Sequence, residues 1–201
     1  VLVTGVQTCA LPICTNPYGN KSRLGTVGIP VPGTAMKVID DDGVELPLGE
    51  RGELCIKGPQ VMKGYWQQPA ATAEALDAEG WLKTGDIAVI DEDGFIRIVD
   101  RKKDLIIVSG FNVYPNEIED VVMAHPAVAN CAVIGVPDER TGEAVKLFVV
   151  ARAEGVSLEE LKSYCKTNFT GYKVPKHIVL RESLPMTPVG KILRRELRDI
   201  A

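Results

Sequence analysis

A lysine near the end of the chain is the residue best placed to do chemistry. Lys191 ends the segment 185–191, Pro-Met-Thr-Pro-Val-Gly-Lys, in which two prolines and a glycine fix a loop, and a helix-like run follows it. A lysine side chain presents a compact positive charge with three donors on a flexible stem. Taken alone, the segment is better explained as a solvated lysine at the start of a helix.

Two upstream segments, 81–86 (Trp-Leu-Lys-Thr-Gly-Asp) and 100–115, carry further polar groups. The carboxylate of Asp86 can accept hydrogen bonds from both hydroxyls of a ribose, which suits it to hold a nucleotide sugar. Arg101 offers a planar fork of donors for ribose or phosphate oxygens. The structural alternatives are a turn or cap aspartate, and a surface arginine paired with Asp100 or Asp104.

These three segments, in this order, resemble the adenylate-forming (AMP-binding) enzymes, which include acyl-CoA synthetases, adenylation domains and luciferases. The resemblance runs from about Thr15 to the end of the chain, and a fourth match is the run 52–59 (Gly-Glu-Leu-Cys-Ile-Lys-Gly-Pro) followed by Gly-Tyr-Trp at 64–66. The sequences of these segments are most similar to those of the bacterial long-chain fatty acid–CoA ligases. ATP and CoA are therefore expected as substrates, with Mg²⁺ accompanying ATP.

The resemblance assigns a role to five residues. A carboxylate first attacks the α-phosphorus of ATP to give an acyl-adenylate, and a thiol then displaces AMP. Lys191 would supply the positive charge for the first step, and Asp86 and Arg101 would hold the ribose. Lys103 falls at the hinge that turns the C-terminal lid between the two steps, and Gly110 falls beside the pantetheine tunnel. The structural alternatives are a solvated charge at Lys103 and a turn glycine at Gly110.

Family members are longer, and this chain is expected to be incomplete and inactive alone. It contains neither the Ser/Thr/Gly-rich loop that holds the ATP phosphates nor the Tyr-Gly-x-Thr-Glu stretch that supplies a magnesium ligand, so no metal ligand is expected in it. Residues 1–13 do not fit the family and resemble a translated cloning adapter, with a divergent native N-terminus as the alternative.

Composition narrows the class of protein. The 201 residues are 45% hydrophobic and 25% charged with a net charge of −4, which is ordinary for a globular protein and argues against a nucleic-acid binder. Five scattered cysteines without a Cys-x-x-Cys pair fit a reducing cytoplasm, and Cys55 and Cys131 lie in apolar runs typical of buried positions. His125 and His177 have no partner at ligand spacing. No run is apolar enough to span a membrane.

Periodicity and turn signals predict an α+β fold in two parts. Residues 14–100 read as the β-rich tail of the large AMP-binding domain, and residues 101–201 as a small mixed α+β lid domain. Strands are expected over 35–39, 52–57, 86–90, 95–99, 105–108, 128–136, 145–150 and 177–180. Helices are expected over 72–76 with Thr72 as N-cap, over 116–124 after Pro115, over 158–169 capped by Ser157 and Glu160, and over 192–200.

Other functions stay open at this point. The chain could belong to an acid–thiol ligase for another carboxylic acid, because the acyl pocket would lie in a part that it does not contain. It could also be a non-catalytic nucleotide-binding or interaction module. The basic residues Lys173, Lys176, Arg194 and Arg195 could meet CoA phosphates, although a solvated face is the simpler explanation. The resemblance further allows a homodimer, and a cytoplasmic protein in peripheral contact with the inner face of the membrane.

Overall fold

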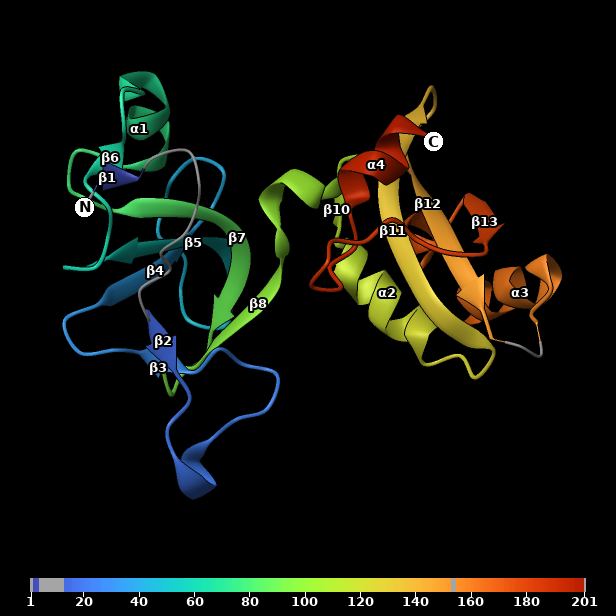
Figure 1. Cartoon of the computed structure of the whole chain (residues 1–201), viewed down its shortest axis with the longest axis horizontal. Coiled ribbons are helices and arrows are strands. Elements are labelled where there is room, and N and C mark those ends of the chain that lie inside the picture. Colours follow the sequence, from blue (N-terminus) through green and yellow to red (C-terminus); the bar gives the residue numbers. More distant parts are fainter. Residues whose placement is uncertain (1, 4–12, 153–154, 201) are drawn as a thin grey trace. The chain divides into compact units, whose positions relative to one another are not determined.

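The computed structural model describes residues 2–3, 13–152 and 155–200, and the chain divides into two compact units, Val1–Lys102 and Lys103–Ala201 (Figure 1). The division falls directly before Lys103, the residue that the resemblance places at the hinge. Both units mix strands with helices, which confirms the predicted α+β class. The adapter-like segment predicted for residues 1–13 lies mostly outside the described residues.

The first unit is built on a four-stranded antiparallel sheet in the order β4-β5-β7-β8. Its strands are β4 (Ala35–Ile39), β5 (Arg51–Lys57), β7 (Leu82–Ile90) and β8 (Ile96–Arg101). Apolar side chains on these strands form one core, made of Val38, Leu54, Ile56, Ala88, Ile90 and Ile96. The four strands predicted for this part of the chain are therefore confirmed, with β7 extending further toward its N-terminal end.

A tight turn joins β7 to β8, as the sequence predicted. Oδ1 of Asp91 accepts hydrogen bonds from the backbone N–H groups of Asp93 (3.0 Å) and Phe95 (2.8 Å). Gly94 adopts a φ of +82°, which glycine reaches without steric cost. The hairpin places the last residues of β8 opposite the middle of β7, and the predicted nucleotide-binding residues lie there.

The short helix of this unit differs from the prediction. Helix α1 (Pro69–Ala75) begins with Pro69 at its first position, so the prediction that Thr72 is its N-cap is wrong. Thr72 lies inside the helix, where its Oγ1 donates to the carbonyl of Gln68 and accepts from the N–H of Tyr65. The remaining elements are β1 (Leu2–Val3), β2 (Cys14–Thr15), a 3-10 helix (Gly19–Lys21), β3 (Ile29–Pro30) and β6 (Gly64–Tyr65).

The second unit contains a five-stranded mixed sheet. The order is β10-β9-β12-β11, with β13 pairing in parallel along β12. Figure 1 shows β11 and β12 as two long curved strands side by side. The strands are β9 (Ile106–Val108), β10 (Phe111–Val113), β11 (Val128–Asp138), β12 (Gly142–Ala151) and β13 (His177–Arg181). A 3-10 helix (Lys102–Asp104) precedes them, and another (Gly171–Lys173) precedes β13.

Both faces of this sheet are covered, because alternate residues of β11 enter two different cores. Cys131 and Val133 belong to the core under α2 (Pro115–Met123) and α3 (Leu158–Asn168). Ala132 and Ile134 belong to the core that includes Leu197 of α4 (Arg194–Asp199). The period of two along a strand produces this division.

The helices of the second unit begin where the sequence predicted, apart from α4. Pro115 occupies the first position of α2, where its missing N–H costs nothing. Ser157 caps α3 by accepting a hydrogen bond from the N–H of Glu160 at 3.1 Å. Helix α4 is shorter than predicted, because residues 192–193 lead into it from a loop. Within the part of the chain that the structure describes, no helix is long and apolar enough to cross a membrane.

Candidate functional site

Asp86 and Arg101, which were predicted to hold a ribose, are direct neighbours across two strands. They face one another in the β7–β8 register, and Nε of Arg101 lies 3.2 Å from Oδ1 of Asp86. The side chains are 29% and 59% exposed, so both remain open to a ligand. Asp86 is thus an ion-pair partner of the Arg101 guanidinium.

The backbone before Asp86 is bent in a way that requires its glycine. Gly85 has a φ of +71°, in the left-handed region that favours glycine. Thr84 holds both sides of this bend, because its Oγ1 donates to the carbonyl of Leu54 at 2.8 Å and accepts from the N–H of Asp86 at 3.1 Å. The Thr-Gly-Asp run therefore fixes the direction in which the Asp86 carboxylate leaves the strand.

The side chain of Glu53 also holds this bend through a hydrogen bond, and the sequence analysis gave this residue no role. Its side chain is 10% exposed, its Oε1 accepts from the N–H of Gly85 at 3.2 Å, and its Oε2 lies 3.0 Å from Nζ of Lys102. Lys102 also lies 3.0 Å from Asp41. The one available signal was a glutamate inside a strand whose central five residues are all buried. Glu53 ties together the residue before Asp86 and the residue after Arg101.

Burial and charge act in opposite directions on the pKa values of this region. Burial raises the pKa of the Asp86 carboxyl, and the positive charge of Arg101 only partly opposes that rise. For Lys102, burial lowers the pKa, but hydrogen bonds to Glu53 and Asp41 outweigh it and the net pKa is raised. The charged form of Lys102 is therefore favoured, whereas the charged form of Asp86 is disfavoured by its burial.

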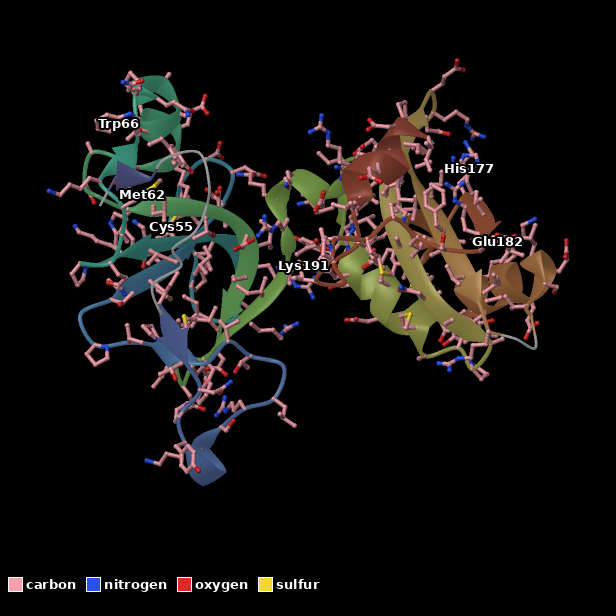
Figure 2. All side chains as sticks on the ribbon, viewed as in Figure 1. Cys55, Met62, Trp66, His177, Glu182 and Lys191 are labelled. Carbon is pink, nitrogen blue, oxygen red and sulfur yellow. The ribbon has the colours of Figure 1, made fainter. Side chains whose placement is uncertain are left out.

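Lys191 lies in the second unit at the end of a closed turn (Figure 2). The N–H of Thr187 donates to the carbonyl of Lys191 at 2.7 Å, and the N–H of Lys191 donates to Oγ1 of Thr187 at 3.0 Å. Met186 and Ile192 form a β-bridge beside them. The side chain is exposed, and its ammonium makes no ion pair with the described residues. The backbone is thus fixed while the charge stays free.

Lys103 and Gly110 also belong to the second unit. Lys103 is exposed, in the 3-10 helix that opens this unit. Ser109 and Gly110 form the two-residue turn between β9 and β10, with φ values of +51° and +82°, as in a type I′ turn. The turn alone therefore accounts for this glycine. A Cβ at Gly110 would meet nothing within 4 Å among the described contacts, and its place beside a tunnel stays a prediction.

Three of the four basic residues considered for CoA phosphates are engaged in ion pairs. Lys173 lies 2.8 Å from Glu117, Lys176 pairs with Asp138, and Nη2 of Arg194 lies 2.7 Å from Glu119. The explanation of a solvated face is therefore wrong for Arg194, whose side chain is 19% exposed.

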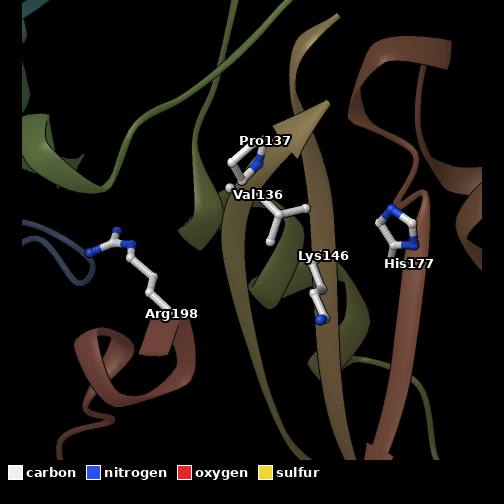
Figure 3. A pocket seen from close by; sticks show the side chains of 6 residues that line it. Val136, Pro137, Lys146, His177 and Arg198 are labelled. Atoms are coloured by element: carbon white, nitrogen blue, oxygen red, sulfur yellow. The ribbon is translucent and has the colours of Figure 1, made fainter. Parts of the chain in front are cut away.

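A cavity, a buried histidine and the absence of a metal cluster in the described part of the chain complete the description of the site. A cavity of about 420 Å³ in the second unit is lined by Gly135, Val136, Pro137, Lys146, His177 and Arg198, and it includes none of the predicted site residues (Figure 3). The ring of His125 is buried, and its Nδ1 accepts from the N–H of Ala127, which is a structural role. Among the described residues, no group of three or more His, Cys, Asp or Glu side chains could hold a metal ion.

Comparison with known proteins is consistent across the chain. The AMP-binding enzyme family model matches residues 4–66, and the AMP-binding enzyme C-terminal domain model matches residues 117–191. The first match begins inside residues 1–13, whose non-native origin stays a prediction.

Three similar proteins span the range of the matches. A long-chain-fatty-acid–CoA ligase of Escherichia coli O6:H1 is 58% identical over 98% of this chain and 35% of its own length. A feruloyl-CoA synthase of Amycolatopsis is 45% identical over 88% of this chain and 36% of its own length. The crystal structure of ATP-bound MatB from Rhodopseudomonas palustris is similar with a TM-score of 0.85 and 39% identity, over 92% of this chain and 37% of that one.

The chain thus spans about a third of the length of the curated relatives that it matches. The two family models match consecutive parts of the chain, the relatives match nearly all of it, and the chain belongs to the AMP-binding enzyme family.

Proposed function

We propose that this chain takes part in the ATP-dependent activation of a fatty acid, first to an acyl-adenylate and then to an acyl-CoA. The single observation that carries this proposal is the presentation of Lys191, an exposed ammonium on a backbone fixed by a closed turn. The identity to long-chain-fatty-acid–CoA ligases supports the choice of substrate class.

In this proposal the positive charge of Lys191 offsets the electrostatic repulsion between two anions. The carboxylate of the acid and the α-phosphate of ATP repel each other as the new bond forms. At 4 Å and an effective dielectric constant of 20, two unit charges interact by about 4 kcal/mol. A lysine held on a rigid turn offsets a repulsion of that order, because its position does not have to be reorganised during the reaction.

Asp86 and Arg101 hold the nucleotide sugar in this proposal. Asp86 is 29% exposed, and the Thr84–Gly85 bend fixes its direction. Its carboxylate would accept from the ribose hydroxyls, while Arg101, at 3.2 Å, keeps the carboxylate charged and oriented. The pair lies on two adjacent, hydrogen-bonded strands, β7 and the edge strand β8, which gives the precise placement that ribose recognition needs.

Mg²⁺ and CoA are also proposed as partners of the reaction. The described residues offer no donor set that fits Mg²⁺, so no step is assigned to a metal held here. Gly110 is proposed to lie beside the path of the CoA thiol, and Lys103 to be the hinge between the two steps.

The test uses a chimera in which the full chain follows the N-terminal two-thirds of the E. coli relative. We expect ATP–pyrophosphate exchange with palmitate in the chimera. Lys191→Ala should lower adenylate formation about 10²- to 10³-fold and spare thioester formation from preformed acyl-adenylate, because one preorganised charged contact has about this effect. Equal losses in both half-reactions would contradict the role of Lys191. The chain alone should give no exchange, and clear turnover by it would contradict the proposed dependence on a separate phosphate loop.

A ligase for another carboxylic acid is the second candidate, favoured by the 45% identity to feruloyl-CoA synthase. A second chimera with the N-terminal part of that enzyme separates the two: the long-chain chimera should be the more active one. If neither chimera supports adenylation while ATP still binds, a non-catalytic nucleotide-binding module is the better explanation. A cytoplasmic location is proposed from the free thiols of Cys14, Cys55, Cys131 and Cys165. Peripheral membrane contact and a homodimer stay predictions.

A further inference from the structure

The residues on either side of Lys103 are each held by ion pairs, but in different units. Lys102 ends the first unit, where it pairs with Glu53 and Asp41 at 3.0 Å each. Asp104 lies in the second unit, and its side chain is 8% exposed. The proposed hinge at Lys103 is thus flanked by two residues that are each held within their own unit.

Asp104 is bound to the helix that follows Lys191. Its Oδ1 lies 2.7 Å from Nη2 of Arg198, and its Oδ2 lies 3.8 Å from Nη1 of Arg194. Arg194 in turn reaches α2, where its Nη2 lies 2.7 Å from Glu119 and 2.8 Å from Oδ1 of Asn116. The carboxylate of Asp104, next to Lys103, thus binds two arginines of α4, Arg194 and Arg198.

The turn that carries Lys191 continues directly into this helix. The N–H of Leu193 donates to the carbonyl of Pro185 at 2.9 Å, and Leu197, a residue of α4, is fully buried. Only two residues separate Lys191 from Arg194, so a displacement of α4 must move the lysine. The position of Lys191 therefore depends on contacts that end at residue 104.

We propose that Asp104 is a positioning residue for Lys191, because it ties the chain just after Lys103 to the helix just after Lys191. The proposal rests on the proposed function and adds a residue to it. Any rotation at Lys103 then carries α4 and the lysine turn as one rigid piece. Without Asp104, Arg194 keeps Glu119 and Asn116, but both arginines lose the contact that transmits the rotation.

The effect on rate should be large even though Asp104 touches no substrate. A misplacement of catalytic groups by about 1 Å can lower a rate by about 10²-fold. In the palmitate chimera, Asp104→Asn should therefore lower adenylate formation about 10- to 100-fold. Thioester formation from preformed acyl-adenylate should stay within about threefold, since that step does not use Lys191. Arg198→Lys, which keeps the charge but loses the fork, should give the same pattern with a smaller loss.

A double-mutant cycle with Lys191→Ala separates positioning from general damage. If Asp104 acts through Lys191, Asp104→Asn should cause no further loss of adenylation once Lys191 is alanine. Asp138→Asn is the matched control, because its side chain is 9% exposed against 8% for Asp104 and pairs with Lys176 in the same unit. Among the described residues, no hydrogen bond or ion pair joins Asp138 to α4. This control should leave adenylation unchanged.

Three results would overturn the proposal. Losses that multiply in the double variant would show that Asp104 acts independently of Lys191. An equal loss in Asp138→Asn would show that lower stability of the unit is the cause. Full activity of Lys191→Ala alone would reject the proposed role of Lys191 as well, and this single-variant result distinguishes that failure from failure of the positioning role.

Discussion

Glu53→Gln tests whether a buried carboxylate holds the ribose-binding strands together. Glu53 accepts from the N–H of Gly85 and from the ammonium of Lys102. A hydrogen bond to a charged group contributes about 1.5–3 kcal/mol. Glutamine keeps one acceptor oxygen for Gly85 but loses the ion pair, while Lys102 is 40% exposed and keeps Asp41. The net loss in the free energy of unfolding should therefore be about 2 kcal/mol.

The assay can be restricted to the first unit. Both tryptophans of the chain, Trp66 and Trp81, lie in that unit, so their fluorescence reports its unfolding in urea. With an m-value of about 1–2 kcal/mol per molar for a unit of this size, the urea midpoint should fall by about 1–2 M.

Glu45→Gln is the matched control for this measurement. Glu45 lies 3.9 Å from Lys37 with its side chain 66% exposed, and an exposed pair of this kind contributes less than about 1 kcal/mol. If Glu53→Gln shifts the midpoint no further than Glu45→Gln does, Glu53 does not hold the bend, and the argument from its two contacts is refuted.

Two further predictions concern the hinge and the pH dependence. In the chimera, Lys103→Pro should keep adenylation within about tenfold and lower thioester formation much more, because proline fixes φ, whereas Lys103→Ala should be mild; equal harm from both would reject the hinge. Asp86→Asn should raise the urea midpoint at pH 7. Burial raises the folded-state pKa of Asp86, against the pull of Arg101, so the ionised form costs stability above that pKa and the cost disappears as the pH falls. The gain should therefore shrink as the pH falls through the raised pKa of Asp86 and be absent below about pH 4, the ordinary pKa of an aspartate, and a lower midpoint at pH 7 would mean that Arg101 outweighs burial.

Local signals in the sequence predicted most of the fold. Strand alternation, the Asp91 turn, Pro115 and Ser157 each depend on residues a few positions apart, and the structure confirms the elements that they predicted. Thr72 misled the prediction because its hydroxyl bonds to the chain before the helix, while Pro69 opens it. The first residue of a helix is ambiguous in the sequence when two nearby residues both carry a signal for a helix start.

The sequence alone could not predict the contacts of the residues that support the candidate site. Glu53 and Lys102 are 49 positions apart, and Asp104 and Arg198 are 94 positions apart. Periodicity carries no information on which distant charges meet. Lys102, Asp104 and Arg198 were visible only as charges in charged runs, and Glu53 only as a glutamate inside an apolar strand. Only the fold makes them partners.

The contacts of Glu119 have a consequence for the behaviour of the protein at high concentration. Strand β11 is the outer strand of its sheet, and such a strand offers unpaired N–H groups to other chains. Here Oε1 of Glu119 accepts from the N–H of Val133 at 2.8 Å, and Oδ1 of Asn130 accepts from the N–H of Cys131 at 2.9 Å. Two donors that could template an added strand are already occupied. The same carboxylate that binds Arg194 thereby protects this edge against aggregation.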